Sequence, residues 1–344
     1  MGVRINVNDR FHNSVTNKPK ESFMCVKRYT VYSCILGLAA NAALAQISSI
    51  NSAVYTPRQY NDIPAATLTV VSNYPSEISF EEQSVSKPTG FANRDSWHFS
   101  NNGTSPFLFG NSDAFTITMD VTLTGDPISP RKEAGFVFNN PLNDGGQFIV
   151  NTDGHEVVAF GGFLPFYAFP RNFNSGDTVT MGLTIFQKSN GKNAIIYFAR
   201  TATNCLQSPP LEFDNLEQGV IAGTSIGGYF QIVNSPTIAT NSGTAVFQNI
   251  KIGPPDQDFD GVPDSADACP STPPCSIVGA HGCSIDQLAP CAGPASGGTW
   301  KNHGQYVSSV AKAVSEFLTE GVINETQAEA IVSAAAQSNC GSKK

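Results

Sequence analysis

Regular alternation of apolar and polar residues limits how this chain can fold more than any other feature does. In residues 114–123 every second side chain is apolar, and residues 178–187 repeat the pattern. Successive side chains of a strand point to opposite faces, so this period predicts half-buried antiparallel strands. No helical periodicity of useful length interrupts the region from Thr67 to Ile252. We therefore predict an antiparallel two-sheet β-sandwich.

Shorter apolar runs in the same region predict further strands. They cover residues 136–138, 147–151, 156–160, 193–199, 228–233 and 246–252. The dipeptides Asp153-Gly154 and Asn190-Gly191 each separate two of these runs. Both dipeptides favour the positive φ of a tight turn, so each predicts a β-hairpin.

Composition excludes several classes of protein. Charged residues make up 14% of the chain, against about 25% in an average globular protein. With 30 Gly and 22 Pro, this argues against a helical bundle, and 23 Phe argue against disorder. The net charge of −8 disfavours nucleic acid as a partner and favours metal cations.

The N-terminal part has the pattern of a secretory signal peptide. Lys27 and Arg28 precede an apolar run over residues 29–40, and Ala43-Leu44-Ala45 forms a small-x-small cleavage pattern. We predict a leader over residues 1–45, with Met24 as the candidate true start. No apolar run is long enough for a membrane span, so we expect a secreted or cell-surface protein.

Cysteine usage agrees with export. Six cysteines follow the predicted cleavage site, namely Cys205, Cys269, Cys275, Cys283, Cys291 and Cys340. An even number in an exported chain predicts disulfides, for which about 15 pairings exist.

The sandwich region, residues 46–253, resembles concanavalin A-like and laminin G-like jelly rolls. The resemblance rests on the strand order, on the hairpin segment 148–155 and on the closing segments 227–232 and 246–252. It implies a jelly-roll architecture and does not identify a catalytic motif.

Composition changes abruptly after the sandwich. Residues 254–291 are rich in Asp, Pro and Cys, and carboxylates occupy alternate positions of a loop that bends at Gly261. A hard divalent cation takes six to eight oxygen ligands, which such a loop can supply. We predict a Ca²⁺ site formed by the carboxylates and one backbone carbonyl of Asp256, Asp258, Asp260, Val262, Asp264 and Asp267.

The segment resembles a type 3 thrombospondin repeat, whose spaced Asp residues end in Asp-x-Cys-Pro. Asp267, Cys269 and Pro270 match that ending, and the resemblance implies the same Asp residues as ligands. The alternative is an acidic, solvated linker.

Residues 292–344 form the only helical region of the sequence. A stripe of apolar residues predicts a helix over residues 306–318 that ends at Gly321. Asn324 and Gln327 predict the capping box of a second helix. We expect a disulfide that involves Cys340, with Cys291 as its candidate partner, to hold this small hairpin.

Aromatic residues supply candidate ligand-binding positions. The segment 160–170 contains five aromatic rings and two glycines, and Trp97 stands beside His98 in another predicted strand. Burial in the core is the competing interpretation, because aromatics in strands are more often buried. His98 is interpreted as a hydrogen-bonded structural residue. The candidates for an exposed binding surface are Trp97, Phe163, Phe166 and Tyr167.

One carboxylate pattern points to an enzyme. Glu212, Asp214 and Glu217 have the spacing of retaining glycosidases in the same superfamily, where such residues act as nucleophile, helper and acid. Here they follow Pro209-Pro210, so we interpret the segment as a loop rather than a catalytic strand.

The sequence favours a secreted or cell-surface calcium-binding protein whose sandwich binds a polysaccharide or a surface protein in adhesion or recognition. Two alternatives stay open. One is a glycoside hydrolase or lyase of the concanavalin A-like superfamily. The other is a structural subunit of an extracellular matrix or fibre.

Overall fold

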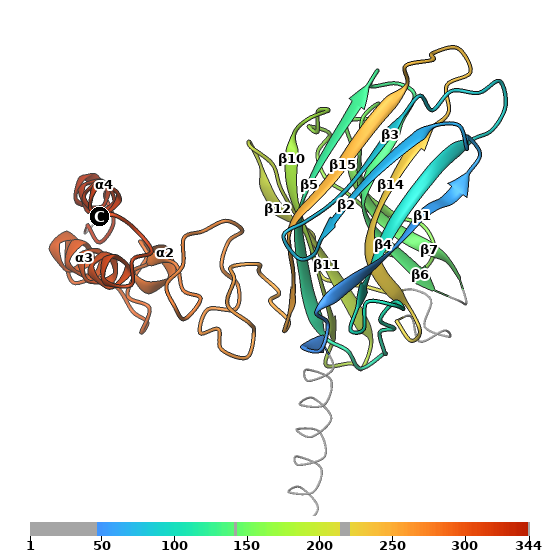
Figure 1. The fold of residues 1–344 in the computed structure, drawn as a ribbon. Coiled ribbons are helices and arrows are strands. Elements are labelled where there is room, and N and C mark those ends of the chain that lie inside the picture. Colours follow the sequence, from blue (N-terminus) through green and yellow to red (C-terminus); the bar gives the residue numbers. More distant parts are fainter. Residues whose placement is uncertain (1–46, 141–142, 214–220, 343–344) are drawn as a thin grey trace, which may run out of the picture. The chain divides into compact units, whose positions relative to one another are not determined.

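A computed structural model describes residues 47–140, 143–213 and 221–342. Within these residues the chain forms two antiparallel sheets that face each other, followed by an irregular segment and three helices (Figure 1). The predicted leader over residues 1–45, the candidate start at Met24, and Asp214 and Glu217 lie outside the described residues.

The first sheet has seven strands. In spatial order they are β1 (Ser52–Asn61), β4 (Ala92–Ser100), β14 (Ser225–Val233), β6 (Lys132–Asn140), β7 (Asn143–Asn151), β8 (Val157–Phe160) and β9 (Tyr167–Ala168). The long-range pairs β4–β14 and β14–β6 place segments far apart in the sequence side by side.

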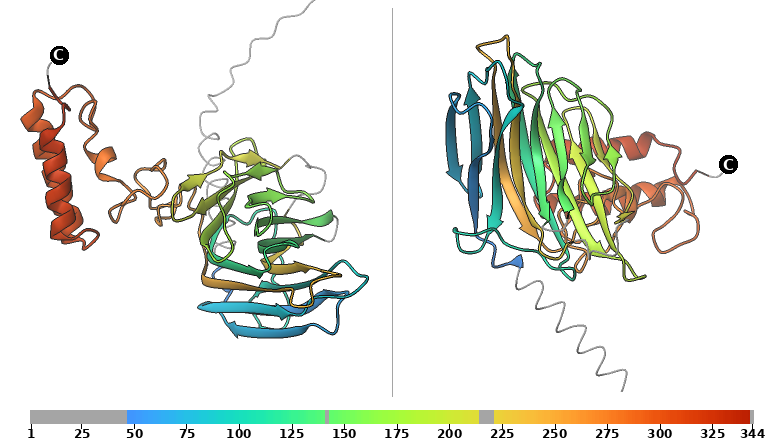
Figure 2. Two further views of the ribbon diagram at one scale, coloured as in Figure 1. Left: turned by 90° about the horizontal axis from the view of Figure 1, so that it is seen from above. Right: turned by 90° about the vertical axis from the view of Figure 1, so that its right-hand side faces the viewer.

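The second sheet has eight strands. Its main path is β12 (Cys205–Gln207), β11 (Asn193–Arg200), β10 (Thr178–Gln187), β5 (Phe115–Asp126), β15 (Ser242–Gly253), β3 (Glu77–Gln83) and β2 (Thr67–Asn73), and β13 (Leu211–Glu212) also pairs with β11. The prediction of a mainly β, antiparallel jelly-roll sandwich is confirmed, and Figure 2 shows its two layers.

Apolar side chains from both sheets fill the space between them. Trp97 on β4 packs edge-on against Phe99 of the same strand and Phe247 of β15. On β5 the alternate residues Phe115 and Ile117 are fully buried in the same core. The period of two therefore assigns one face of each strand to the interior and the other to the outside.

Both predicted hairpins form, with one difference in turn chemistry. The Asn190-Gly191 turn joins β10 to β11, and Gly191 has a φ of 80°. Between β7 and β8 the positive φ falls on His155, at 55°, instead of Gly154. The His155 ring is fixed there because its Nδ1 lies 2.8 Å from the carbonyl oxygen of Phe173.

The C-terminal helices have their own small core. They are α2 (Ile285–Leu288), α3 (His303–Thr319) and α4 (Glu325–Gln337). The predicted capping box of Asn324 and Gln327 is present at the start of α4. Trp300 and Phe317 belong to the apolar cluster that the helices share. No described helix is long and apolar enough to cross a membrane.

All six cysteines outside the leader form disulfides. The pairs are Cys205–Cys275, Cys269–Cys283 and Cys291–Cys340. The last pair confirms the expected link across the helical hairpin. Since disulfides persist in oxidising compartments, these bonds fit a protein outside the reducing cytosol.

Candidate functional site

Three of the predicted calcium ligands converge in the segment after the sandwich. One carboxylate oxygen each of Asp256, Asp258 and Asp260 lies within 4.8 Å of the other two. Gly261, with a φ of 96°, allows the sharp bend that follows. Phe259, between two of the carboxylates, has a φ of 57°, which few non-glycine residues adopt.

The electrostatics of this cluster match a cation site. Asp256 Oδ1 and Asp260 Oδ2 are buried, and neither has a hydrogen-bond partner. Burial, with the charge of neighbouring carboxylates, raises the pKa of Asp256 to about 7 and that of Asp260 to about 6. Buried carboxylate oxygens without partners are costly, and a bound cation removes that cost. The residues therefore fit a divalent ion.

The remaining predicted ligands occupy different positions. Asp267 lies beside the cluster, because a Cβ placed on Gly282 would meet Asp267 Oδ1 at 2.0 Å and Asp260 Oδ2 at 3.0 Å. Asp264 is turned toward Gln257, whose backbone and side-chain nitrogens donate to its two oxygens at 2.8 and 2.6 Å. The amide of Val262 donates to Asp260 Oδ1 at 2.8 Å.

The acidic loop is attached to the outside of the eight-stranded sheet. The hydroxyl of Thr184 donates to the backbone carbonyl of Asp256 at 2.7 Å, and the Asp256 amide donates to Thr116 Oγ1 at 2.8 Å. The Phe259 ring stacks on Phe198 of β11, with centroids 4.8 Å apart. A Cβ on Gly182 would lie only 2.9 Å from that ring, so the glycine makes room for it.

A second cluster of polar side chains lies on the outer face of the seven-stranded sheet. On β4, Trp97 and Phe99 point into the core, so the alternate residues Arg94, Ser96 and His98 point away from it. β14 pairs with β4, and β6 pairs with the other edge of β14. Both strands add polar side chains to this face. We call Arg94, His98, Glu133, Asn139, Tyr229 and Gln231 the outer-face cluster.

Arg94 is the cation of the outer-face cluster. Its Nε donates to Gln231 Oε1 at 2.9 Å. Its guanidinium carbon lies 4.6 Å from the ring centre of Tyr60 and 5.1 Å from that of Tyr229. Arg94 forms no ion pair with any residue in the described part of the chain. An acidic ligand would supply the missing carboxylate.

His98 lies farther along β4 and is neutral at physiological pH. Its Nε2 is 2.9 Å from Asn139 Nδ2 on β6. The residue is 4% exposed, and burial lowers the pKa of its imidazole to about 4. A neutral imidazole can accept a proton, and the partly exposed amide of Asn139 beside it can bind an anionic oxygen.

Glu133 fixes Tyr229 and Gln231 of the outer-face cluster. Its Oε2 accepts a hydrogen bond of 2.8 Å from the Tyr229 hydroxyl and one of 3.4 Å from Gln231 Nε2. Arg131 pairs with the same carboxylate at 3.3 Å. Burial, together with the Glu133 charge, raises the pKa of Tyr229 well above its usual value. Tyr229 is therefore a fixed, protonated support for Arg94.

Two of the predicted aromatic binding residues are in the core. Trp97 is fully buried between the sheets. Phe163 is also buried, with its ring 6.2 Å from Phe138 and 6.0 Å from Phe213. Their large apolar areas are more stable between the layers than in water. Neither side chain therefore reaches an exposed binding surface.

The other two predicted aromatic residues reach the surface. Phe166 is 70% exposed, and Tyr167 is half-buried against Phe169, with ring centres 4.9 Å apart. Phe166 lines a pocket at the edge of the seven-stranded sheet.

Glu212 is the one residue of the glycosidase-like carboxylate pattern that the structure describes. Glu212 lies in the short edge strand β13 rather than in a loop, and it pairs with Lys188 at 2.7 Å and Lys192 at 3.0 Å. Hydrogen bonds from these lysines and from Asn190 lower the pKa of Glu212 to about 2. A carboxylate held ionised in this way does not serve as a general acid.

Comparisons with known proteins find similarity at the level of structure. No protein-family profile and no curated protein sequence matches the chain. The marine PL-14 alginate lyase from Aplysia kurodai matches at 11% identity and a TM-score of 0.34, over 54% of this chain and 86% of the lyase. The alginate lyase from Klebsiella pneumoniae matches at 10% identity and a TM-score of 0.36, over 58% of this chain and 94% of the lyase. A functionally unknown protein from Saccharomyces cerevisiae matches at 12% identity and a TM-score of 0.36, over 61% of this chain and 98% of that protein.

These neighbours correct the function expected from the sequence. An adhesion or recognition protein was favoured there, whereas the two neighbours of stated activity are lyases. Both lyases fall in the alternative class that the sequence left open, that of glycoside hydrolases and lyases. A likeness at these identities and TM-scores assigns no activity to this chain, so the case for an activity must come from its own residues.

Proposed function

We propose that this protein is a carbohydrate-active enzyme that cleaves an acidic polysaccharide by β-elimination on the outer face of its seven-stranded sheet. The observation that carries the proposal is the placement of a neutral His98 on the same strand and face as Arg94, a cation with no ion-pair partner among the described residues. Elimination requires a proton acceptor and groups that bind carboxylates, and the outer-face cluster contains both.

Each residue has a defined task in this reaction. The Asn139 amide turns from His98 Nε2 to the carboxylate of the reacting uronate unit, and the freed Nε2 of His98 removes the proton from the carbon next to that carboxylate. The electrons of the broken C–H bond form a C=C bond, and the bond to the glycosidic oxygen breaks. The imidazolium returns its proton to that oxygen, so no water is consumed.

Arg94 serves another sugar unit of the same polymer. It lies four residues from His98 along β4, which is roughly 13 Å at about 3.3 Å per residue. A polymer of uronates carries a carboxylate on every unit, so it can engage both positions. Gln231, Tyr229 and Glu133 hold Arg94 in place and are positioning residues.

Elimination explains the cluster better than hydrolysis does. Hydrolysis of glycosides usually requires two carboxyl groups, one of them protonated. In the outer-face cluster the single carboxyl group, Glu133, is engaged by Tyr229, Gln231 and Arg131. Glu212 lies on the other sheet and is paired with lysines.

A panel of polysaccharides tests the proposed reaction. We expect uronate polymers to give new reducing ends and the ultraviolet absorbance of a conjugated C=C bond, while neutral glucans and mannans stay intact. Reducing ends without that absorbance would indicate hydrolysis. If every uronate polymer is bound but left intact, or is not bound at all, the proposal is wrong.

We also propose that the segment 254–291 binds Ca²⁺ and resembles a type 3 thrombospondin repeat in this respect. Asp256, Asp258, Asp260 and Asp267 would hold the ion, and the unpartnered buried oxygens of two of them support this assignment. The ion supplies charge neutralisation that keeps the loop folded against β10 and β11. The predicted leader over residues 1–45 would export the protein to a calcium-containing environment.

Replacing Phe259 by alanine should weaken Ca²⁺ binding about fivefold. The stack on Phe198 contributes about 1 kcal/mol, and it holds a left-handed residue between two ligands. Calorimetric titration of Ca²⁺ into the full chain measures the change. The exposed Ile277 lies in the same segment, so Ile277→Ala is the control and should bind as the wild type does. If Phe259→Ala and Ile277→Ala bind Ca²⁺ with equal affinity, the contact of the Phe259 ring with Phe198 does not contribute to ion binding.

A further inference from the structure

A pocket at the edge of the seven-stranded sheet lies outside the reaction centre described above. It has a volume of about 230 Å³ and is formed by β8, β9 and the residues that flank them. Ligand pockets for larger molecules are usually about 300 to 1,000 Å³, so this one suits a single ring-sized group.

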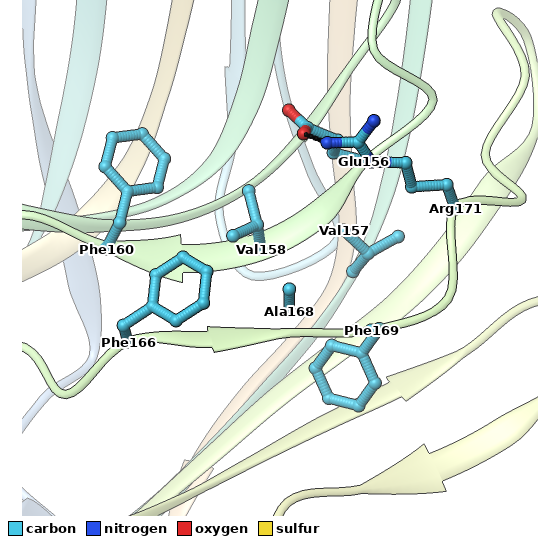
Figure 3. Close-up of a pocket in the computed structure, with 8 residues that line it drawn as sticks. All are labelled: Glu156, Val157, Val158, Phe160, Phe166, Ala168, Phe169 and Arg171. Carbon is cyan, nitrogen blue, oxygen red and sulfur yellow. Dashed lines mark hydrogen bonds and ion pairs between the residues drawn. The ribbon is translucent and has the colours of Figure 1, made fainter.

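The pocket has an apolar end and a polar end. Phe160 and Phe166 lie at one end and the pair Glu156–Arg171 at the other, with the small side chain of Ala168 between them (Figure 3). An aromatic face next to a polar pair suits a sugar ring, which has an apolar face and hydroxyls at its rim.

Exposure of the aromatic end indicates a binding role. Phe166 is 70% exposed, the highest value among the large apolar side chains described. Its loop is held in place, because the Tyr197 hydroxyl donates to the carbonyl of Pro165 at 3.1 Å. A loop that is already held in place loses less freedom when a ligand stacks on its aromatic ring.

The polar end offers a donor and an acceptor side by side. Arg171 Nη2 donates to Glu156 Oε1 at 2.6 Å, and the Arg171 side chain is 71% exposed. A guanidinium has five N–H donors, so this contact leaves others for a ligand. Adjacent sugar hydroxyls can donate to the carboxylate and accept from the guanidinium.

The pocket is continuous with the outer face on which His98 lies. Val158 of the pocket belongs to one apolar cluster with Ile149 of β7, Val137 of β6 and Tyr229 of β14, which reaches across that face. We infer that the pocket is an end subsite that binds one sugar unit of the same uronate polymer. This inference rests on the proposed function. It adds that the oligouronate must be long enough to reach from His98 to the pocket.

The test compares oligouronates of increasing length. In a His98→Gln background, which slows turnover, we expect the Kd to fall once the oligomer is long enough to reach the pocket. Phe166→Ala should remove that gain and raise the Kd of the long oligomers about tenfold, with no change for the short ones. Phe91 is 61% exposed and lies outside the pocket, so Phe91→Ala is the matched control.

Two results separate the possible failures. Equal Kd values for Phe166→Ala and its parent at every length would remove the subsite and leave the proposed reaction intact. No binding of any oligomer by the parent would contradict the reaction site and the subsite together. Calorimetry gives both readouts without relying on catalysis.

Discussion

A His98→Gln variant should keep the sandwich fold and lose roughly 10²- to 10⁴-fold in the rate of polyuronate cleavage. Glutamine keeps a polar group that can bond Asn139 but has no nitrogen that accepts a proton at neutral pH. Binding should persist, because Arg94 and its supports are unchanged. The measurement is the initial rate of C=C absorbance with substrate in excess, alongside the Kd from calorimetry.

The pH profile supplies a second test of the same residue. Burial lowers the pKa of His98 to about 4, so the neutral, proton-accepting form is present above that value. The cleavage rate should be flat between roughly pH 5 and 7 and fall as the pH drops through about 4. A fall centred near 6.5, the ordinary value for histidine, would show that the titrating group is not a buried imidazole.

The control for His98→Gln is His281→Gln. His281 is exposed and lies in the calcium segment, outside the outer-face cluster. Its replacement should leave the rate unchanged. If His98→Gln turns over substrate at the rate of this control, His98 is not the proton acceptor.

The second large effect is expected on calcium removal. At a Ca²⁺ concentration about a hundredfold above the Kd, binding adds about 2.7 kcal/mol to the free energy of unfolding. For a domain of this size that corresponds to roughly 5–10 °C in melting temperature. A chelator should lower the melting temperature by this amount, because the carboxylates of Asp256, Asp258 and Asp260 are left to repel one another.

The combined variant Asp258→Ala and Asp260→Ala should abolish the response to chelator. Asp286 is exposed in the first turn of α2, so Asp286→Ala is a matched loss of one carboxylate and should respond as the wild type does. Identical melting curves of the wild type with and without chelator would contradict a structural Ca²⁺ ion.

Local patterns predicted the architecture well. The strand expected over residues 178–187 is β10, and the Asn324 capping box begins α4. These features depend on residues close in sequence, where alternation and capping preferences act directly. Strands β1, β2 and β3 were not predicted, because their outward positions are polar and their apolar runs are weak.

The outer-face cluster was not predicted, for a physical reason. His98 and Asn139 meet only because β14 pairs with both β4 and β6, a non-local arrangement that periodicity does not specify. One signal was present: residues 94, 96 and 98 alternate with Trp97 and Phe99, which indicates that their side chains share the face opposite the core. The same alternation explains why Trp97 is buried.

The most direct test of the chemistry at His98 is to cleave a uronate polymer in water enriched in heavy oxygen. The masses of the products are then measured by mass spectrometry. Elimination consumes no water, so the products should carry a C=C bond and no more heavy label than a preformed oligouronate takes up by exchange at its reducing end, and the His98→Gln variant should form them at least about a hundredfold more slowly. Products that carry the label and lack the double bond would contradict elimination at the outer face, as would an intact polymer.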